Sequence, residues 1–260
     1  MPDFLDILVN NAIKTIEEGY YEVAAKSDAP SISLKEAILK CKKAPVISEV
    51  KFASPSMGFI RENRNLVEVV RGMKEGGAIG VSVLTEPKYF KGHINFIAEI
   101  RNQVNIPILM KDIILSRKQI DAASRTGVNA VLLIQALFDR GYCERDVQSM
   151  IAYSHSRGLE VLLEVHTEEE FLPALETNAD MIGINNRDLK TLKVDLKVTK
   201  LLLAKHRDFG DKVIVSESGI NSPQDLRFLW RCGAQAFLVG TVIMKASNIL
   251  EKVKELVEAL

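Results

Sequence analysis

Short, almost wholly apolar runs alternate along this chain with longer segments whose apolar residues recur at helical spacing. The apolar runs are rich in Val, Ile and Leu and follow one another at intervals of about 20–35 residues, which leaves room for one helix and two loops each time. We therefore expect eight strands, each followed by a helix. The expected strands are Val46–Lys51, Gly80–Leu84, Ile108–Lys111, Ala130–Ile134, Glu160–Glu164, Met181–Asn185, Val213–Ser216 and Ala236–Val239.

Strands this apolar are buried on both faces, as in a parallel sheet covered by helices. Eight strand–helix units in 260 residues predict the α/β class and a (β/α)₈ TIM barrel, with residues 1–260 forming a single barrel domain. The alternative is an open, doubly wound sheet. That fold normally has fewer strands and a glycine-rich first turn, whereas no GxGxxG pattern follows the first strand here.

Residues 1–44 precede the first expected strand and form an N-terminal helical extension of the barrel domain. Ser33 and Glu36 have the spacing of a capping box, which predicts a second helix that runs toward Lys42. The sequence leaves open whether the extension closes the bottom of the barrel or covers its mouth. The first helix is indicated by an apolar stripe of Phe4, Leu5, Leu8, Ala12, Ile16 and Tyr20.

Charge and composition exclude several classes of protein. The chain has 34 basic and 34 acidic side chains, so a general affinity for nucleic acid or for an anionic membrane is not expected. Its first 20 residues lack the apolar core of a signal peptide, and no apolar run is long enough to span a bilayer. Three widely spaced cysteines predict neither a disulfide framework nor a zinc site, and they fit a cytoplasmic location.

Polar side chains stand at the carboxyl ends of several expected strands. In a TIM barrel these ends form the mouth where chemistry takes place. Burial of an unpaired charge costs several kcal/mol, so charged ends on many strands at once favour a catalytic site over a structural role. Glu49 and Lys51 lie two residues apart and therefore share one face of the first strand. The other strand-end residues are Lys111, Glu164, Asn185, Glu217 and Ser218.

The last two strands predict a phosphate site. Ser218 and Gly219 follow the seventh strand, and Gly240 and Thr241 follow the eighth. Loops at these two places bind phosphate in many TIM barrels, where glycines let main-chain N–H groups approach the anion.

Taken together, these motifs resemble those of the indole-3-glycerol phosphate synthase family, from about residue 45 to the C-terminus. The N-terminal extension also fits that family. The matching motifs are Glu49-Val50-Lys51 with Ser54-Pro55-Ser56, Val83-Leu84-Thr85-Glu86 with Tyr89-Phe90 and Gly92, Pro107 to Asp112, Leu163-Glu164-Val165, Ile182 to Leu189, and Glu217-Ser218-Gly219-Ile220.

The resemblance implies a carboxy-lyase of tryptophan biosynthesis that needs neither a metal nor an organic cofactor. Its substrate is 1-(o-carboxyphenylamino)-1-deoxyribulose 5-phosphate, which undergoes ring closure, decarboxylation and dehydration by general acid–base catalysis. The partner expected is this small sugar phosphate, for a monomer or homodimer that binds neither nucleic acid nor membrane.

The resemblance also implies roles for individual residues. Lys111 would be the general acid of ring closure, and Glu164 would transfer a proton in dehydration. Lys51 would pair with substrate anions and donate a proton later, while Glu49 and Asn185 orient these groups. The substrate-binding residues would be Ser54, Pro55, Phe90, Leu132, Arg187, Leu189 and Glu217, and the phosphate would be held by Ser218, Gly219, Gly240 and Thr241.

Three positions depart from the family pattern. Phe52 and Met57 stand where many relatives carry lysine, and Ile113 replaces an aromatic residue, so the loop after the first strand is less basic and the ring pocket looser. We also expect neighbouring cations and partial burial to lower the pKa of the catalytic lysine toward ~7–8, where it donates protons well.

Two rival functions remain open on the same barrel. One is an aldolase in which Lys111 forms a Schiff base with a carbonyl substrate. The other is a non-catalytic barrel that only binds a sugar phosphate, although a binder has no need of buried acid–base pairs. His166, two residues beyond Glu164, is either an alternative acid–base group or a histidine on the rim.

Overall fold

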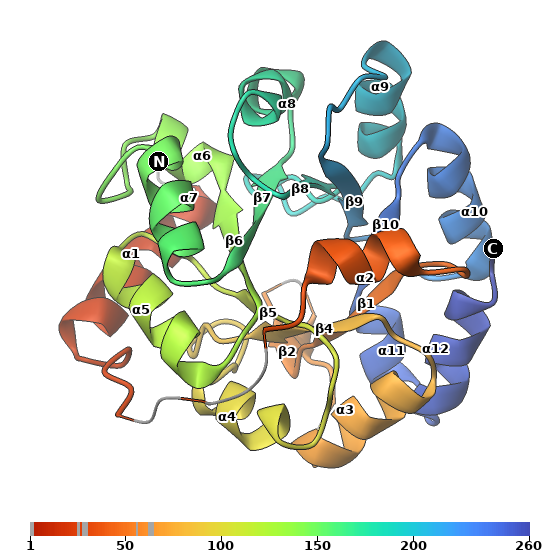
Figure 1. The fold of residues 1–260 in the computed structure, drawn as a ribbon, viewed down its shortest axis with the longest axis horizontal. Helices are drawn as coiled ribbons and strands as arrows, with labels where there is room; N and C mark the ends of the chain where they lie inside the picture. The colour runs from red at the N-terminus through yellow and green to blue at the C-terminus, as the bar shows by residue number, and fades with distance from the viewer. Residues whose placement is uncertain (1–2, 25–26, 28–30, 56, 62–64) are drawn as a thin grey trace.

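The computed structural model describes residues 3–24, 27, 31–55, 57–61 and 65–260. Eight parallel strands close into a barrel in the order β1-β10-β9-β8-β7-β6-β5-β4, and an outer ring of helices surrounds them (Figure 1). The expected (β/α)₈ architecture is therefore confirmed. The barrel strands are β1 (Val46–Val50), β4 (Gly80–Leu84), β5 (Ile108–Lys111), β6 (Ala130–Ile134), β7 (Glu160–Val165), β8 (Met181–Asn185), β9 (Val213–Glu217) and β10 (Ala236–Val239).

Five of these strands have the bounds that the apolar pattern predicts, and the other three differ by one residue at the carboxyl end. Strand β1 ends at Val50 because the chain then leaves the barrel for a hairpin of β2 (Ala53–Ser54) and β3 (Gly58–Phe59). Lys51 consequently projects from the end of β1 rather than from within it. Ser56, the last residue of the Ser-Pro-Ser motif, lies outside the described residues.

Most helices of the outer ring begin at a residue whose side chain caps the first turn. For example, Ser222 forms a capping box with Asp225 ahead of α10, and Gly233 ends that helix in a left-handed conformation. The ring comprises α3 (Leu66–Glu75), α4 (Asn95–Arg101), α5 (Arg117–Thr126), α7 (Val147–Ser156), α8 (Glu168–Leu175), α9 (Lys197–Lys205), α10 (Pro223–Cys232) and α12 (Ile249–Val257). Two short helices, α6 (Gln135–Asp139) and α11 (Thr241–Lys245), start directly at the ends of β6 and β10.

Alternation along each strand divides the core into two parts. Outward-facing residues such as Val81 and Val83 pack under the helices. Inward-facing residues fill the lower barrel with apolar side chains, among them Ile47, Leu109 and Leu162. The inward-facing positions nearer the carboxyl ends carry the charged residues instead, so the lower barrel is a solid floor beneath a polar mouth.

The two helices of the extension lie at opposite ends of the barrel. Helix α1 (Phe4–Glu17) places Leu5 and Leu8 on the cavity at the mouth. Helix α2 (Leu34–Lys40) crosses the other end (Figure 1), where the main-chain N–H of Leu34 donates to Glu160 at the start of β7. Both roles that the sequence left open are therefore filled, one by each helix.

The capping box expected before α2 is only half formed. Ser33 Oγ accepts from the N–H of Glu36, as predicted, but the Glu36 carboxylate pairs with Lys40 one turn later. The helix also ends at Lys40, two residues before the expected end. Within the described part of the chain, no helix has both the length and the apolar character needed to cross a bilayer.

Candidate active site

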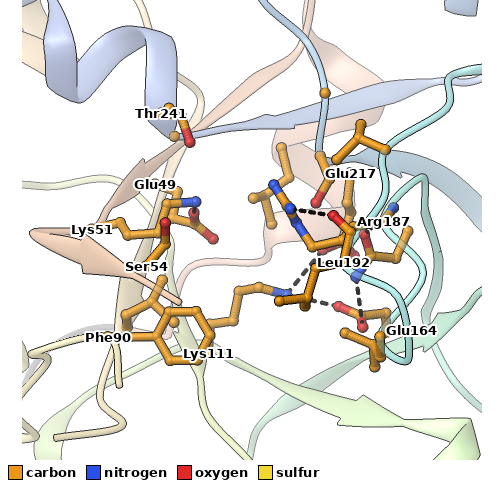
Figure 2. A pocket seen from close by; sticks show the side chains of 18 of the residues that line it. Glu49, Lys51, Ser54, Phe90, Lys111, Glu164, Arg187, Leu192, Glu217 and Thr241 are labelled. Carbon is orange, nitrogen blue, oxygen red and sulfur yellow. Dashed lines mark hydrogen bonds and ion pairs between the residues drawn. The ribbon is translucent and has the colours of Figure 1, made fainter. Parts of the chain in front are cut away.

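A cavity of about 800 Å³ opens at the carboxyl ends of the barrel strands. Figure 2 shows Lys111 in its middle, with Glu49 and Lys51 on one side and Glu164 and Glu217 on the other. Every residue that the sequence predicts for the site lines this one cavity. These residues are Glu49, Lys51, Ser54, Pro55, Phe90, Lys111, Leu132, Glu164, Asn185, Arg187, Leu189, Glu217, Ser218, Gly219, Gly240 and Thr241.

Glu49 and Lys51 form a close ion pair across the end of β1. Lys51 Nζ lies 2.6 Å from Glu49 Oε1, and both side chains are largely buried. The space for the Glu49 carboxylate comes from Gly240, since a Cβ at that position would lie 2.5 Å from Glu49 Oε1. Glu49 and Lys51 therefore share one face, as their i, i+2 spacing predicts, and form one acid–base pair there.

Lys111 is held between two carboxylates from the far side of the barrel. Its Nζ lies 2.8 Å from Glu164 Oε2 and 3.1 Å from Glu217 Oε2. Both glutamates are almost fully buried, with side chains 3% and 1% exposed, so solvent screens this cluster little. The sequence assigned Glu217 to substrate binding alone and did not foresee its contact with the lysine.

The electrostatics of this cluster oppose one of our expectations. Burial alone would lower the pKa of Lys111, but the carboxylates of Glu164, Glu217 and Glu49 outweigh burial and raise it. The expected fall of a lysine pKa toward neutrality is thus wrong for Lys111. The reason is that its neighbours are carboxylates and not the cations we assumed.

The two glutamates beside Lys111 are shifted in opposite directions. Burial would raise the pKa of Glu164, but the Lys111 ammonium and a hydrogen bond from Asn185 lower it. Burial raises the pKa of Glu217 beyond what Lys111 offsets, and the negative charge on Glu164 adds to that rise. The cluster therefore keeps Lys111 charged beside an ionised Glu164, whereas Glu217 holds a proton more readily than a free glutamate does.

Asn185 connects the acidic cluster to the loop after β8. Its Nδ2 donates to Glu164 Oε1 at 3.0 Å, and its Oδ1 accepts the main-chain N–H of Arg187 at 2.9 Å. The Arg187 guanidinium donates to the carbonyl of Leu192 at 2.8 Å. Arg187 lines the cavity, and no other hydrogen bond of its guanidinium is found among the described residues, so its remaining N–H donors suit a carboxylate.

The loop after β9 has an unusual backbone at the predicted phosphate site. Ser218 and Gly219 adopt positive φ values of 65° and 82°, and a Cβ on Gly219 would lie 2.5 Å from Val194. Asn186 fixes this turn, because its side-chain amide donates to the carbonyls of Glu217 and Ser218. Successive residues of this kind turn main-chain N–H groups to one side, and Gly240 and Thr241 line the cavity from the end of the neighbouring strand β10.

The apolar end of the cavity combines predicted residues with some that the sequence analysis missed. Phe90, Leu132 and Leu189 lie here together with Phe4, Leu5 and Leu8 of α1. The loop that carries Phe90 is fixed by Glu86, whose carboxylate accepts the N–H groups of Tyr89 and Phe90 at 2.7 and 2.9 Å. Asn11 of α1 donates to the same carboxylate at 2.7 Å, so the extension helps to build this end of the site.

The three departures from the family pattern have different surroundings. Phe52 is buried against Phe96 in the apolar cluster between the barrel wall and the helices. Ile113 lines the cavity and packs in the same apolar cluster as Leu5 and Leu8 of α1. Met57 lines the cavity from the loop between β2 and β3.

His166 directly follows β7 and hydrogen-bonds to the end of β8. Its Nδ1 donates to the main-chain carbonyl of Asn185 at 2.7 Å, and its main-chain N–H donates to Glu170. The imidazole thus supports the strand end that carries Asn185, which favours the reading of His166 as a histidine on the rim.

Fold and site together define a TIM-barrel enzyme with an acid–base cluster at its mouth. The family model for indole-3-glycerol phosphate synthase matches residues 7–256. Indole-3-glycerol phosphate synthase of Pyrococcus furiosus is 40% identical over 87% of this chain and 97% of its own length; that of Methanocaldococcus jannaschii is 41% identical over 96% and 91%. The chain belongs to the indole-3-glycerol phosphate synthase family.

More distant solved structures share the fold alone. A thiamine phosphate pyrophosphorylase of Pyrococcus furiosus superposes with a TM-score of 0.60 at 18% identity, over 87% of this chain and 97% of that one. The N-acetylmannosamine-6-phosphate 2-epimerase of Clostridium perfringens gives a TM-score of 0.61 at 16% identity, over 84% and 93%.

Proposed function

We propose that this chain converts 1-(o-carboxyphenylamino)-1-deoxyribulose 5-phosphate to indole-3-glycerol phosphate, with Lys111 as the general acid of ring closure. The observation that carries this proposal is the position of Lys111 Nζ, 2.8 and 3.1 Å from two buried carboxylates at the base of the cavity. Family membership supports the reaction class, a carboxy-lyase step of tryptophan biosynthesis.

In the first step, the ring carbon that bears the carboxylate attacks the carbonyl carbon of the sugar chain. The carbonyl oxygen gains negative charge as the new bond forms, and the Lys111 ammonium donates a proton to it. The raised pKa of Lys111 keeps the ammonium charged until that moment. The raised pKa of Glu217 keeps a second proton nearby, which can restore the ammonium.

The carboxylate then leaves as carbon dioxide, and the new hydroxyl leaves as water. Glu164 is suited to take up the proton released in dehydration, because its lowered pKa keeps it ionised and Asn185 orients it. Lys51 and Glu49 form the second acid–base pair, on the opposite wall of the cavity. Lys51 assists departure of the hydroxyl as a proton donor in this proposal.

Different parts of the cavity are complementary to the phosphate and to the aromatic ring of the substrate. The phosphate, which carries about −1.5 to −2 charges at neutral pH, fits the turns at Ser218–Gly219 and Gly240–Thr241. Arg187 suits the carboxylate of the aromatic ring, and Ser54 and Pro55 line the same cavity. The ring itself fits the apolar end. The residues of that end are Phe90, Leu132 and Leu189.

We also place the enzyme in the cytoplasm, as a monomer or a homodimer. All three cysteines are free thiols, which supports a reducing compartment.

Indole fluorescence provides a direct test of the proposed activity. The purified chain should form a fluorescent indole product from the carboxyphenylamino substrate, and Lys111→Ala should lower kcat by about 10²–10⁴-fold while the protein stays folded. Lys118→Ala is the matched control, because Lys118 is exposed on α5 and should keep full activity. A Lys111→Ala variant that retains more than about a tenth of kcat would refute the role of Lys111.

A further inference from the structure

Gly183 occupies an inward-facing position in β8, directly among the acidic residues. It pairs with Glu164 of β7 on one side and with Val215 of β9 on the other. Asn185 is the next inward-facing residue of β8, and Glu217 is its partner in β9. Gly183 therefore lies level with Glu164 and one inward-facing position below Asn185.

The space that a side chain at position 183 would occupy is filled by another residue. A Cβ on Gly183 would overlap Oε1 of Glu217 and would lie 3.2 Å from its Cδ and 3.4 Å from Leu162 Cδ1. The backbone gives no other reason for glycine here, since Gly183 is not among the glycines with positive φ. The Glu217 carboxylate thus occupies the volume that any other residue at position 183 would take.

This arrangement decides which way Glu217 points. With Oε1 in the space above Gly183, Oε2 reaches Lys111 Nζ at 3.1 Å. Among the described residues, Oε1 has no hydrogen-bond partner, so it is the absence of a side chain at 183 that accommodates this oxygen. Glu217 is 1% exposed and cannot swing into solvent to avoid a larger neighbour.

We propose that Gly183 is a positioning residue for the reaction: its missing side chain creates the space that holds the Glu217 carboxylate against Lys111. The inference rests on the proposed function, because it matters for turnover only if Lys111 is the acid. Gly183 itself does not touch the reacting atoms. It acts through Glu217, and an added methyl group would push that carboxylate away from the ammonium.

A double-mutant cycle between positions 183 and 217 tests the proposal. Gly183→Ala alone should lower kcat at least about tenfold, with a smaller change in KM, as expected when an acid–base cluster is misplaced. Glu217→Ala empties the space above position 183. In that background Gly183→Ala should change the remaining kcat by less than about twofold. Gly72→Ala is the matched control, because a Cβ there makes only ordinary contacts, the nearest at 3.4 Å to Ile249.

Thermal unfolding supplies a second cycle that does not depend on residual activity. Gly183→Ala should lower Tm in the wild-type background and leave it almost unchanged in the Glu217→Ala background. Equal losses in both backgrounds, in kcat or in Tm, would overturn the proposal, as would a Gly183→Ala variant with near wild-type kcat. Absence of turnover by the unmodified chain would instead refute the proposed function, so the two failures are distinguishable.

Discussion

The hydroxyl of Tyr21 donates a hydrogen bond of 2.9 Å to Asp112 Oδ2, although 91 positions separate the two residues in the chain. Asp112 directly follows Lys111, and its other oxygen accepts the main-chain N–H of Ile113 at 2.8 Å. Thr85 at the end of β4 donates to Asp112 as well. This buried network ties the segment after α1 to the strand that carries the proposed acid.

Loss of the Tyr21 hydroxyl should reduce turnover without removing any group that touches the substrate. We expect Tyr21→Phe to lower kcat several-fold and to destabilise the fold by about 1–3 kcal/mol, because the buried Asp112 loses one donor. Steady-state kinetics and urea unfolding measure the two effects. Tyr142→Phe is the control, since it removes a similar bond to Asp6 at the surface. Equal, small effects of both changes would show that the Tyr21 bond has no special role.

Stability should depend on the ionisation of Asp112. Burial raises the pKa of this carboxyl group from 3.8 to about 6. Between about pH 4 and 6 the native state therefore binds more protons at Asp112 than the unfolded chain does, so this group stabilises the fold increasingly as pH falls. Relative to Asp112→Asn, the wild-type free energy of unfolding should rise from about pH 7 to pH 4.5. Denaturant titrations with a constant difference across this range would contradict the shift.

Glu164→Gln should separate proton transfer from binding. The substitution keeps the shape of the side chain but removes its charge and its ability to take up a proton. We expect a large fall in kcat, on the order of 10²-fold or more, with a modest change in KM. A variant that raises KM and keeps kcat would show that Glu164 is a binding group.

Borohydride trapping distinguishes acid catalysis from covalent catalysis at Lys111. A Schiff base requires a neutral amine, whereas two carboxylates raise the pKa of Lys111 and keep it charged. Borohydride added during turnover should therefore leave the mass of the protein unchanged. A stable substrate adduct on Lys111, located by peptide mass spectrometry, would move this chain toward the aldolases.

The strands were predictable because each is a short run of consecutive, mostly apolar residues. A run such as Val81 to Leu84 is short and rich in Val, which favours a buried strand over a helix, and the polar residues after such runs mark the barrel mouth. The convergence of Glu49, Lys111 and Glu164 on one cavity followed from the barrel topology, which brings all strand ends together.

Other features depend on side-chain directions that spacing does not encode. The sequence contains the charged residues that surround Lys111, but which of them contact it depends on the register of the barrel strands. For this reason the predicted direction of the Lys111 pKa shift was wrong. The contribution of α1 was unpredictable for a similar reason. Asn11 reaches Glu86 across 75 positions, and nothing in either local pattern indicates the contact.

Helix α2 and the apolar residues beneath the site close the amino-terminal end of the barrel. Ile47, Leu109 and Leu162 fill the interior below the polar layer, so nothing passes through the barrel axis. Among the described residues, the cavity opens at the carboxyl ends of the strands, and there substrate must enter and product, carbon dioxide and water must leave. Substrate and product therefore share one route, so the indole product has to leave the cavity before the next substrate binds.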